Sequence, residues 1–305
     1  MRQLILRYPV LSFVILTLGF QFAVVGFVGW HLPKGAHIGD DETAHKVFRL
    51  RAFGPLAFAM LLTAYMEGRA GLFNLFRSFG KWKVGARWYA LAFSWKFVFT
   101  NLGVGAIVLL GIKGWPGWGA GQGPTGLLHA SEGLVANLPF IVGIAFVEET
   151  AWMKYCVTRM QERYTAFASC FLIGVCWGLW YLPMLLVGEG VPDGYPWPIF
   201  VLSMTCLAIL LGWAYNMTRS GTVLLIMQII SNCAFFLIPV LPAWHHGDPT
   251  YITGFVTVNL LSAITLVLVF GTKELGTKPR ARWSDGMPPK PAAAPEAVKM
   301  AAENA

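Results

Sequence analysis

The sequence predicts an all-α protein that crosses a membrane about eight times. Of its 305 residues, 56% are hydrophobic and only 12% are charged, whereas about 25% of a typical soluble domain is charged. The mean hydropathy is +0.58, and apolar runs near the roughly 20 residues that a spanning helix needs recur along the chain. Lysine and arginine also fall unevenly between the connections of these runs. We therefore interpret the length of the chain as a number of membrane spans and not as a number of soluble domains.

The apolar runs give the position of each span. We expect the spans at residues 9 to 30, 50 to 67, 88 to 112, 136 to 160, 165 to 188, 196 to 217, 221 to 242 and 251 to 271. The second has the shortest uncharged core, AFGPLAFAMLLTAYM, and a partly sheltered helix of this length still fits. Together the spans predict one transmembrane helical domain over residues 1–271.

The basic residues predict which ends face the cytoplasm, because short cytoplasmic loops carry the excess of lysine and arginine. With the N-terminus inside, sixteen basic residues lie on the inner side and five on the outer side. The outer five are Lys34, Lys46, Arg49, Arg51 and Lys113. We therefore expect an integral protein of a bacterial inner (plasma) membrane with both termini cytoplasmic. The net charge of +8 then matches anionic inner-leaflet lipid, and we expect no nucleic-acid partner.

Two segments differ from the spans in composition. Residues 69 to 87 intersperse bulky apolar side chains with basic ones, a pattern typical of an amphipathic helix on the inner membrane surface. Residues 272–305 are rich in proline, alanine and charge, and such a segment has too few apolar residues to build a core. We expect it to be a disordered cytoplasmic tail.

Polar residues within the spans are the candidate functional groups, because ionisable residues inside a membrane usually face protein or water. Glu148 and Glu149 are adjacent, about 100° apart on an α-helix, so one site can directly face only one of them. Tyr181 lies near the end of the next span. In the seventh span, Gln228 and Asn232 are four residues apart and so share a helix face.

These residues fall within three runs, EETAWMKYCVTRMQERY, CWGLWYLPML and MQIISN. Between about 136 and 236 they resemble, in order, the three motifs of the CPBP family, the CAAX prenyl proteases and bacteriocin-processing (Abi-type) intramembrane proteases. The family pattern is Glu-Glu-x-x-x-Arg, then an aromatic residue, three others and histidine, then His-x-x-x-Asn. Here Glu148, Glu149, Trp177 and Asn232 match, whereas Met153, Tyr181 and Gln228 replace the arginine and the two histidines. The resemblance implies a CPBP/Abi-type helical bundle.

The resemblance also implies roles for these positions. In the family, the first glutamate and the first histidine activate a water for peptide hydrolysis, and the second histidine and the asparagine stabilise the oxyanion. A tyrosine, with an unperturbed pKa of about 10, accepts protons poorly at neutral pH. We therefore expect a divergent, non-catalytic homologue whose site is formed by Glu148, Glu149, Tyr181, Gln228 and Asn232. The alternative is an active glutamate-dependent endopeptidase that cleaves a membrane-embedded peptide.

Plainer roles remain open for the same residues. The glutamates could cap polar groups between helices, Tyr181 could belong to an interfacial aromatic belt, and Gln228 and Asn232 could join helices through hydrogen bonds. We expect no cofactor and no metal, because all six histidines fall on the predicted outer side, away from the glutamates. The expected partners are membrane lipids and another integral membrane protein or complex, to which this chain would be an accessory or assembly subunit.

Overall fold

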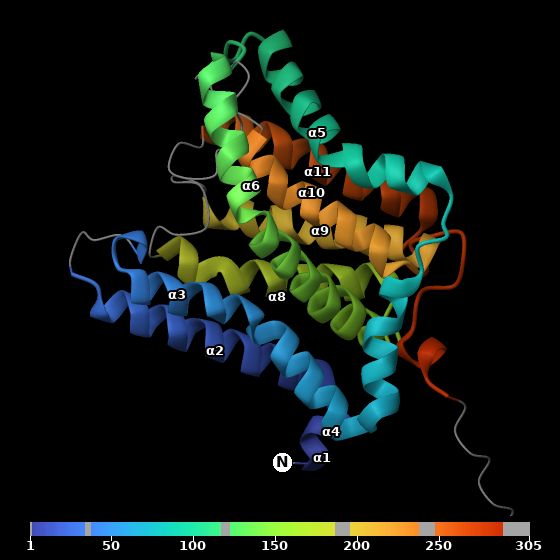
Figure 1. The fold of residues 1–305 in the computed structure, drawn as a ribbon. Coiled ribbons are helices and arrows are strands. Elements are labelled where there is room, and N and C mark those ends of the chain that lie inside the picture. Colours follow the sequence, from blue (N-terminus) through green and yellow to red (C-terminus); the bar gives the residue numbers. More distant parts are fainter. Residues whose placement is uncertain (1, 34–37, 117–122, 187–195, 238–247, 289–305) are drawn as a thin grey trace, which may run out of the picture.

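The computed structural model describes residues 2–33, 38–116, 123–186, 196–237 and 248–288. These residues form a helical bundle (Figure 1). Its α-helices are α1 (Arg2–Arg7), α2 (Pro9–His31), α3 (Glu42–Leu50), α4 (Gly54–Phe76), α5 (Ala86–Leu109), α6 (Gly123–Glu148), α7 (Thr158–Met160), α8 (Ala166–Leu186), α9 (Trp197–Thr218), α10 (Gly221–Leu237) and α11 (Pro249–Phe270). Short 3₁₀ turns are η1 (Ile38–Asp40), η2 (Arg51–Phe53), η3 (Arg77–Gly80) and η5 (Trp283–Gly286), and η4 (Glu149–Val157) is a π-helix.

The long helices pack as neighbours around η4. α2 contacts both α4 and α8, α8 packs on α9, and α9 packs on α11, which also contacts α5 (Figure 1). α10 fills the space between α5, α6 and α9. The π-helix contacts α4, α6, α8, α9 and α10, and all nine of its residues are buried. The segment that begins with Glu149 is therefore at the centre of the bundle.

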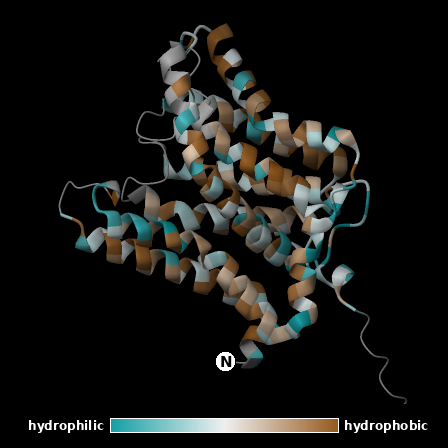
Figure 2. Ribbon diagram, viewed as in Figure 1, coloured by the Kyte–Doolittle hydropathy of each residue, from teal (hydrophilic) through white to brown (hydrophobic). Residues whose placement is uncertain are grey.

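Seven stretches of the described chain contain helices long and apolar enough to cross a membrane. Each overlaps one of the predicted spans, and the remaining one corresponds to α10, which at 17 residues is shorter. Figure 2 shows hydrophobic positions along the long helices and hydrophilic ones in the C-terminal segment after α11. Large apolar side chains also point outward, such as Leu268, which is 80% exposed. The predicted all-α polytopic membrane fold is confirmed.

The predicted amphipathic helix at residues 69 to 87 is shorter and less regular than expected. α4 bends at Gly68, whose φ of 58° and ψ of −143° lie outside the helical region, and a backbone of this kind favours glycine. The helix then ends at Phe76, and a 3₁₀ turn continues to Gly80. Residues 81–85 are not helical, so this segment is a short helix followed by a 3₁₀ turn and a non-helical connection.

The C-terminal segment also differs from the sequence prediction. Residues 272–288 pack against the bundle, and Leu275 and Trp283 are buried. The side chain of Asn216 hydrogen-bonds to two backbone groups of the segment, at 3.0 and 2.8 Å. These contacts order a sequence whose composition predicts disorder, whereas the remainder of the predicted tail, 289–305, lies outside the described residues.

α11 begins at a charged cap. The side chain of Asp248 accepts a hydrogen bond from the backbone amide of Thr250 at 2.9 Å and another from the ammonium of Lys113. Partial burial would raise the pKa of Asp248, but the hydrogen bonds from Lys113 and Thr250 outweigh it, so the pKa is lowered. The hydrogen bond to Asp248 raises the pKa of Lys113. The pair therefore joins the connection after α5 to the start of α11.

Candidate functional site

The two glutamates lie where α6 becomes the π-helix η4. Glu148 is the last residue of α6 and Glu149 is the first residue of η4. A π-helix forms backbone hydrogen bonds from residue i to i+5, and segments of this kind are frequent at functional sites. Both glutamates are completely buried. The carboxylates therefore depend on neighbouring helices for hydrogen-bond partners.

Glu148 receives one hydrogen bond on each carboxylate oxygen. The hydroxyl of Tyr181 on α8 donates to Oε1, and Nε2 of Gln228 on α10 donates to Oε2 at 2.7 Å. The structure thus brings together three of the five predicted site residues, each from a different helix. The two donors therefore hold the side chain of Glu148 between α8 and α10.

Glu149 has no such partners. Neither of its carboxylate oxygens accepts a hydrogen bond from any described residue. Four residues along the chain, where a partner could lie, Met153 is buried among apolar groups. Lys154 instead donates to Oδ1 of Asn74 at 3.2 Å. Glu149 is thus a buried acid without a hydrogen-bonded cation among the described residues.

Asn232 is separate from the acids. It lies one turn after Gln228 on α10 and is partly exposed. Within the described part of the chain, no hydrogen bond joins Asn232 to Glu148 or Glu149. The predicted pair of amides on one face of α10 therefore contributes one direct partner of Glu148, which is Gln228.

The sequence analysis missed a buried cation near the acid. Arg51, which the sequence analysis counts among the outer charges, is only 4% exposed. Its guanidinium lies 3.9 Å from the ring centroid of Phe48 and donates to Sδ of Met184 at 2.9 Å and to Oε1 of Gln21 at 3.4 Å. Its charge also interacts with Tyr181 and Glu148. The available sequence signal was Gln21, a polar residue in the middle of the first span.

The chemistry available at Glu148 differs from that of a glutamate–histidine pair. An imidazole can take up a proton and return it, whereas the hydroxyl of Tyr181 and the amide of Gln228 both act here as hydrogen-bond donors. The cluster is therefore suited to holding a carboxylate in place. Among the described residues, no three His, Cys, Asp or Glu side chains are grouped closely enough to hold a metal ion.

A comparison with family models gives one match. Residues 130–234 match the model described as Type II CAAX prenyl endopeptidase Rce1-like. The match begins within α6 and ends within α10, so it contains both glutamates, Tyr181, Gln228 and Asn232. No curated protein matches the chain.

Proposed function

This chain belongs to the CPBP family through residues 130–234, and we propose that it is a divergent, non-catalytic homologue of the family's intramembrane proteases. In this role it binds a membrane protein or a lipid-like partner and acts as an accessory or assembly subunit. The proposal concerns the region around Glu148, where the family's two glutamates and its asparagine are retained but both histidines are replaced.

The observation that supports loss of catalysis is the pair of hydrogen bonds to Glu148. Each carboxylate oxygen already accepts from a protein donor, Tyr181 or Gln228. A carboxylate oxygen has a second lone pair for a water, but hydrolysis also needs a group that takes up and returns a proton. Tyr181 and Gln228 instead donate their hydrogens to Glu148 and so do not act as proton acceptors there. The activation of a water therefore lacks the proton-accepting group that the family's histidine provides.

Partner binding is supported by the groups that remain near the acid. The guanidinium Nε of Arg51 and the amide oxygen Oε1 of Gln228 are buried and have no hydrogen-bond partner among the described residues. Buried polar groups without partners are costly. A bound polypeptide or headgroup that supplied an acceptor to Arg51 and a donor to Gln228 would relieve that cost.

The second candidate function is an active, glutamate-dependent endopeptidase. The observation that favours it is Glu149, which is buried and has two carboxylate oxygens that no described residue engages. Such a carboxylate is available to accept a proton from a water, and the buried amide of Gln228 could still contribute to stabilising an oxyanion.

The test is to restore the family's residues. Wild type and the triple variant Met153→Arg, Tyr181→His, Gln228→His are reconstituted with a farnesylated, internally quenched peptide. Wild type should not cleave this peptide faster than its Glu148→Gln variant. The triple variant should cleave at least about a hundredfold faster than wild type, because a positioned acid–base group contributes about 10²- to 10⁴-fold.

Two controls make this result decisive. Adding Glu148→Gln to the triple variant should abolish the gained activity. If Met153→Arg prevents folding, because position 153 is only 1% exposed, the double variant Tyr181→His, Gln228→His retains the methionine. Cleavage by wild type that Glu148→Gln abolishes would overturn the non-catalytic proposal. A folded triple variant without activity would overturn the proposal that the site retains the geometry of the family's active site.

The accessory role and the location have separate tests. The native particle extracted in mild detergent should have a mass well above one chain, and a monomer would contradict the accessory role. We also propose a bacterial inner membrane with both termini cytoplasmic, from the sixteen-to-five distribution of basic residues. A cysteine introduced at Lys273 should react with a membrane-impermeant maleimide only after the cells are opened.

A further inference from the structure

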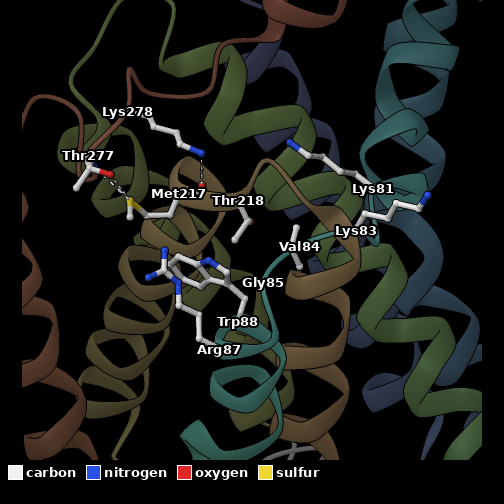
Figure 3. Close-up of a pocket in the computed structure, with 10 residues that line it drawn as sticks. All are labelled: Lys81, Lys83, Val84, Gly85, Arg87, Trp88, Met217, Thr218, Thr277 and Lys278. Atoms are coloured by element: carbon white, nitrogen blue, oxygen red, sulfur yellow. Dashed lines mark hydrogen bonds between the residues drawn. The ribbon is translucent and has the colours of Figure 1, made fainter.

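A second site lies where α5 begins and α9 ends. It is a half-open pocket of about 310 Å³ (Figure 3). Its walls come from the connection 81–85, the first turn of α5, the last turn of α9 and the C-terminal segment near Lys278. Lys81, Lys83, Arg87 and Lys278 supply the charged lining. Met217 and Thr218 lie within the matched residues 130–234, whereas all four cationic residues of the pocket lie outside that range.

The fold holds these cations in a shared region. Lys278 donates from its ammonium to the backbone oxygen of Met217 at 3.3 Å, which fixes the C-terminal segment beside the end of α9. Figure 3 shows the side chains of Lys278 and Lys81 extending toward one another, with Arg87 below them, whereas the ammonium of Lys83 extends away. Three cationic groups therefore converge on the pocket.

The positive charges of the pocket are not paired with acidic side chains in the described part of the chain. Among the described residues, none of the charged groups in the pocket forms an ion pair with an aspartate or glutamate. Desolvation lowers the pKa of Lys81, and the charges of Lys278, Arg219 and Arg77 lower it further. The electrostatic environment therefore opposes a positive charge on Lys81, and a bound anion would relieve this repulsion.

The backbone at the start of α5 adds to the positive electrostatic potential of the pocket. Gly85 caps α5 without a side-chain hydrogen bond, so the first amide groups of this 24-residue helix have no side-chain acceptor. The N-terminus of a helix carries a partial positive charge and favours anions. Together with the cationic side chains, this makes the pocket suited to a phosphate oxygen.

The position of the pocket indicates where the anion comes from. It lies at the ends of α5 and α9, two helices long and apolar enough to span a membrane. Trp82, between Lys81 and Lys83 in sequence, is 61% exposed, and exposed tryptophan beside basic residues is typical of the headgroup region. Trp88 forms an apolar wall of the pocket. The pocket volume of about 310 Å³ also leaves room for more than a phosphate ion.

We propose that this pocket binds the phosphate of an anionic phospholipid headgroup, with Lys81, Arg87 and Lys278 as its cationic contacts. The ammonium groups and the guanidinium approach the phosphate oxygens from the protein side, and the headgroup carbons lie against Trp88. Such a site would hold an anionic lipid at one membrane surface, independently of any activity at Glu148.

The test measures binding to the full chain in neutral detergent. The probes are dioctanoyl phosphatidylglycerol, its zwitterionic phosphatidylcholine counterpart and inorganic phosphate, each titrated while the thermal unfolding midpoint is recorded. Phosphatidylglycerol should raise the midpoint of wild type. The triple variant Lys81→Gln, Arg87→Gln, Lys278→Gln should bind it about 100-fold more weakly, because each basic residue near an anionic lipid surface contributes about a fivefold change in affinity.

The matched control removes three exposed charges outside the pocket, with Arg69→Gln, Arg163→Gln and Lys273→Gln. It has the same net charge as the pocket variant and should bind like wild type. Equal weakening in the two triple variants would show general attraction and overturn the site. Phosphatidylcholine as effective as phosphatidylglycerol would also overturn it, and inorganic phosphate that reproduces the whole effect would overturn the lipid assignment. If the pocket variant does not fold, the single variant Lys81→Gln takes its place, with about a fivefold loss expected.

Discussion

Removing the hydroxyl of Tyr181 tests whether the cluster around Glu148 is held together by hydrogen bonds to a charged acceptor. In Tyr181→Phe the ring remains and only the donor to Oε1 of Glu148 is lost. A hydrogen bond to a charged group contributes about 1.5–3 kcal/mol, whereas neutral bonds between membrane helices average about 0.6 kcal/mol. Since Glu148 is completely buried, no bulk water replaces the missing donor. We expect a loss of about 2 kcal/mol in the free energy of unfolding.

The matched control is Tyr155→Phe. The hydroxyl of Tyr155 donates to a neutral backbone oxygen, that of Pro9, at 3.4 Å, so its loss should reduce the free energy of unfolding by less than about 1 kcal/mol. Reversible unfolding in mixed micelles gives both values. In a Glu148→Gln background, the cost of Tyr181→Phe should fall by about 1 kcal/mol or more, because the charged acceptor is gone. Equal costs for the two tyrosines, or no change in that background, would refute the reasoning.

Two further predictions concern helix packing and the cap of α11. A Cβ at Gly103 would lie 2.6 Å from the backbone of Gly254, so Gly103→Ala should destabilise the fold by about 1–3 kcal/mol, whereas Gly105→Ala, with open space around it, should not. Thermal unfolding of the two variants distinguishes these outcomes. Asp248→Ala should cost about 1 kcal/mol through loss of the cap. The stability difference between wild type and Asp248→Asn should be present between about pH 4 and pH 10, shrink in acid as the lowered pKa of Asp248 is passed, and shrink again in alkali above the raised pKa of Lys113. A pH-independent difference would contradict the charge pairing.

The sequence predicts the meeting of Glu148, Tyr181 and Gln228 because polar residues are scarce in its apolar spans. Each of the three belongs to a run that resembles a family motif, and interior polar groups in a membrane need partners on other helices. What the pattern omits is the direction of each hydrogen bond. Tyrosine and glutamine each carry both a donor and an acceptor, so only the folded arrangement assigns both of them as donors to Glu148.

The sequence analysis counts Arg51 among the outer charges and does not predict that its side chain is buried. A count of basic residues treats each one near a span end as solvated, but a long side chain can turn inward where aromatic rings and a polar group receive it. Phe48, Trp180 and Gln21 provide that environment. The spacing of residues in the sequence likewise does not predict the π-helix, because an α-helix is the default for an apolar segment of this length.

The position of the acids depends on contacts that lie outside the matched family region. Glu67 on α4 accepts two hydrogen bonds of 2.9 Å from Arg159, just after the π-helix, and also accepts from the indole of Trp283. Asn74, two turns later on α4, accepts from Lys154 within the π-helix and donates to the backbone oxygen of Trp283 at 2.9 Å. α4 and the C-terminal segment therefore hold the far end of the π-helix, while the bonds to Glu148 hold its beginning. Since an unusual helix persists only where its surroundings stabilise it, the orientation of the two glutamates is a property of the whole bundle, and the motif residues alone do not determine it.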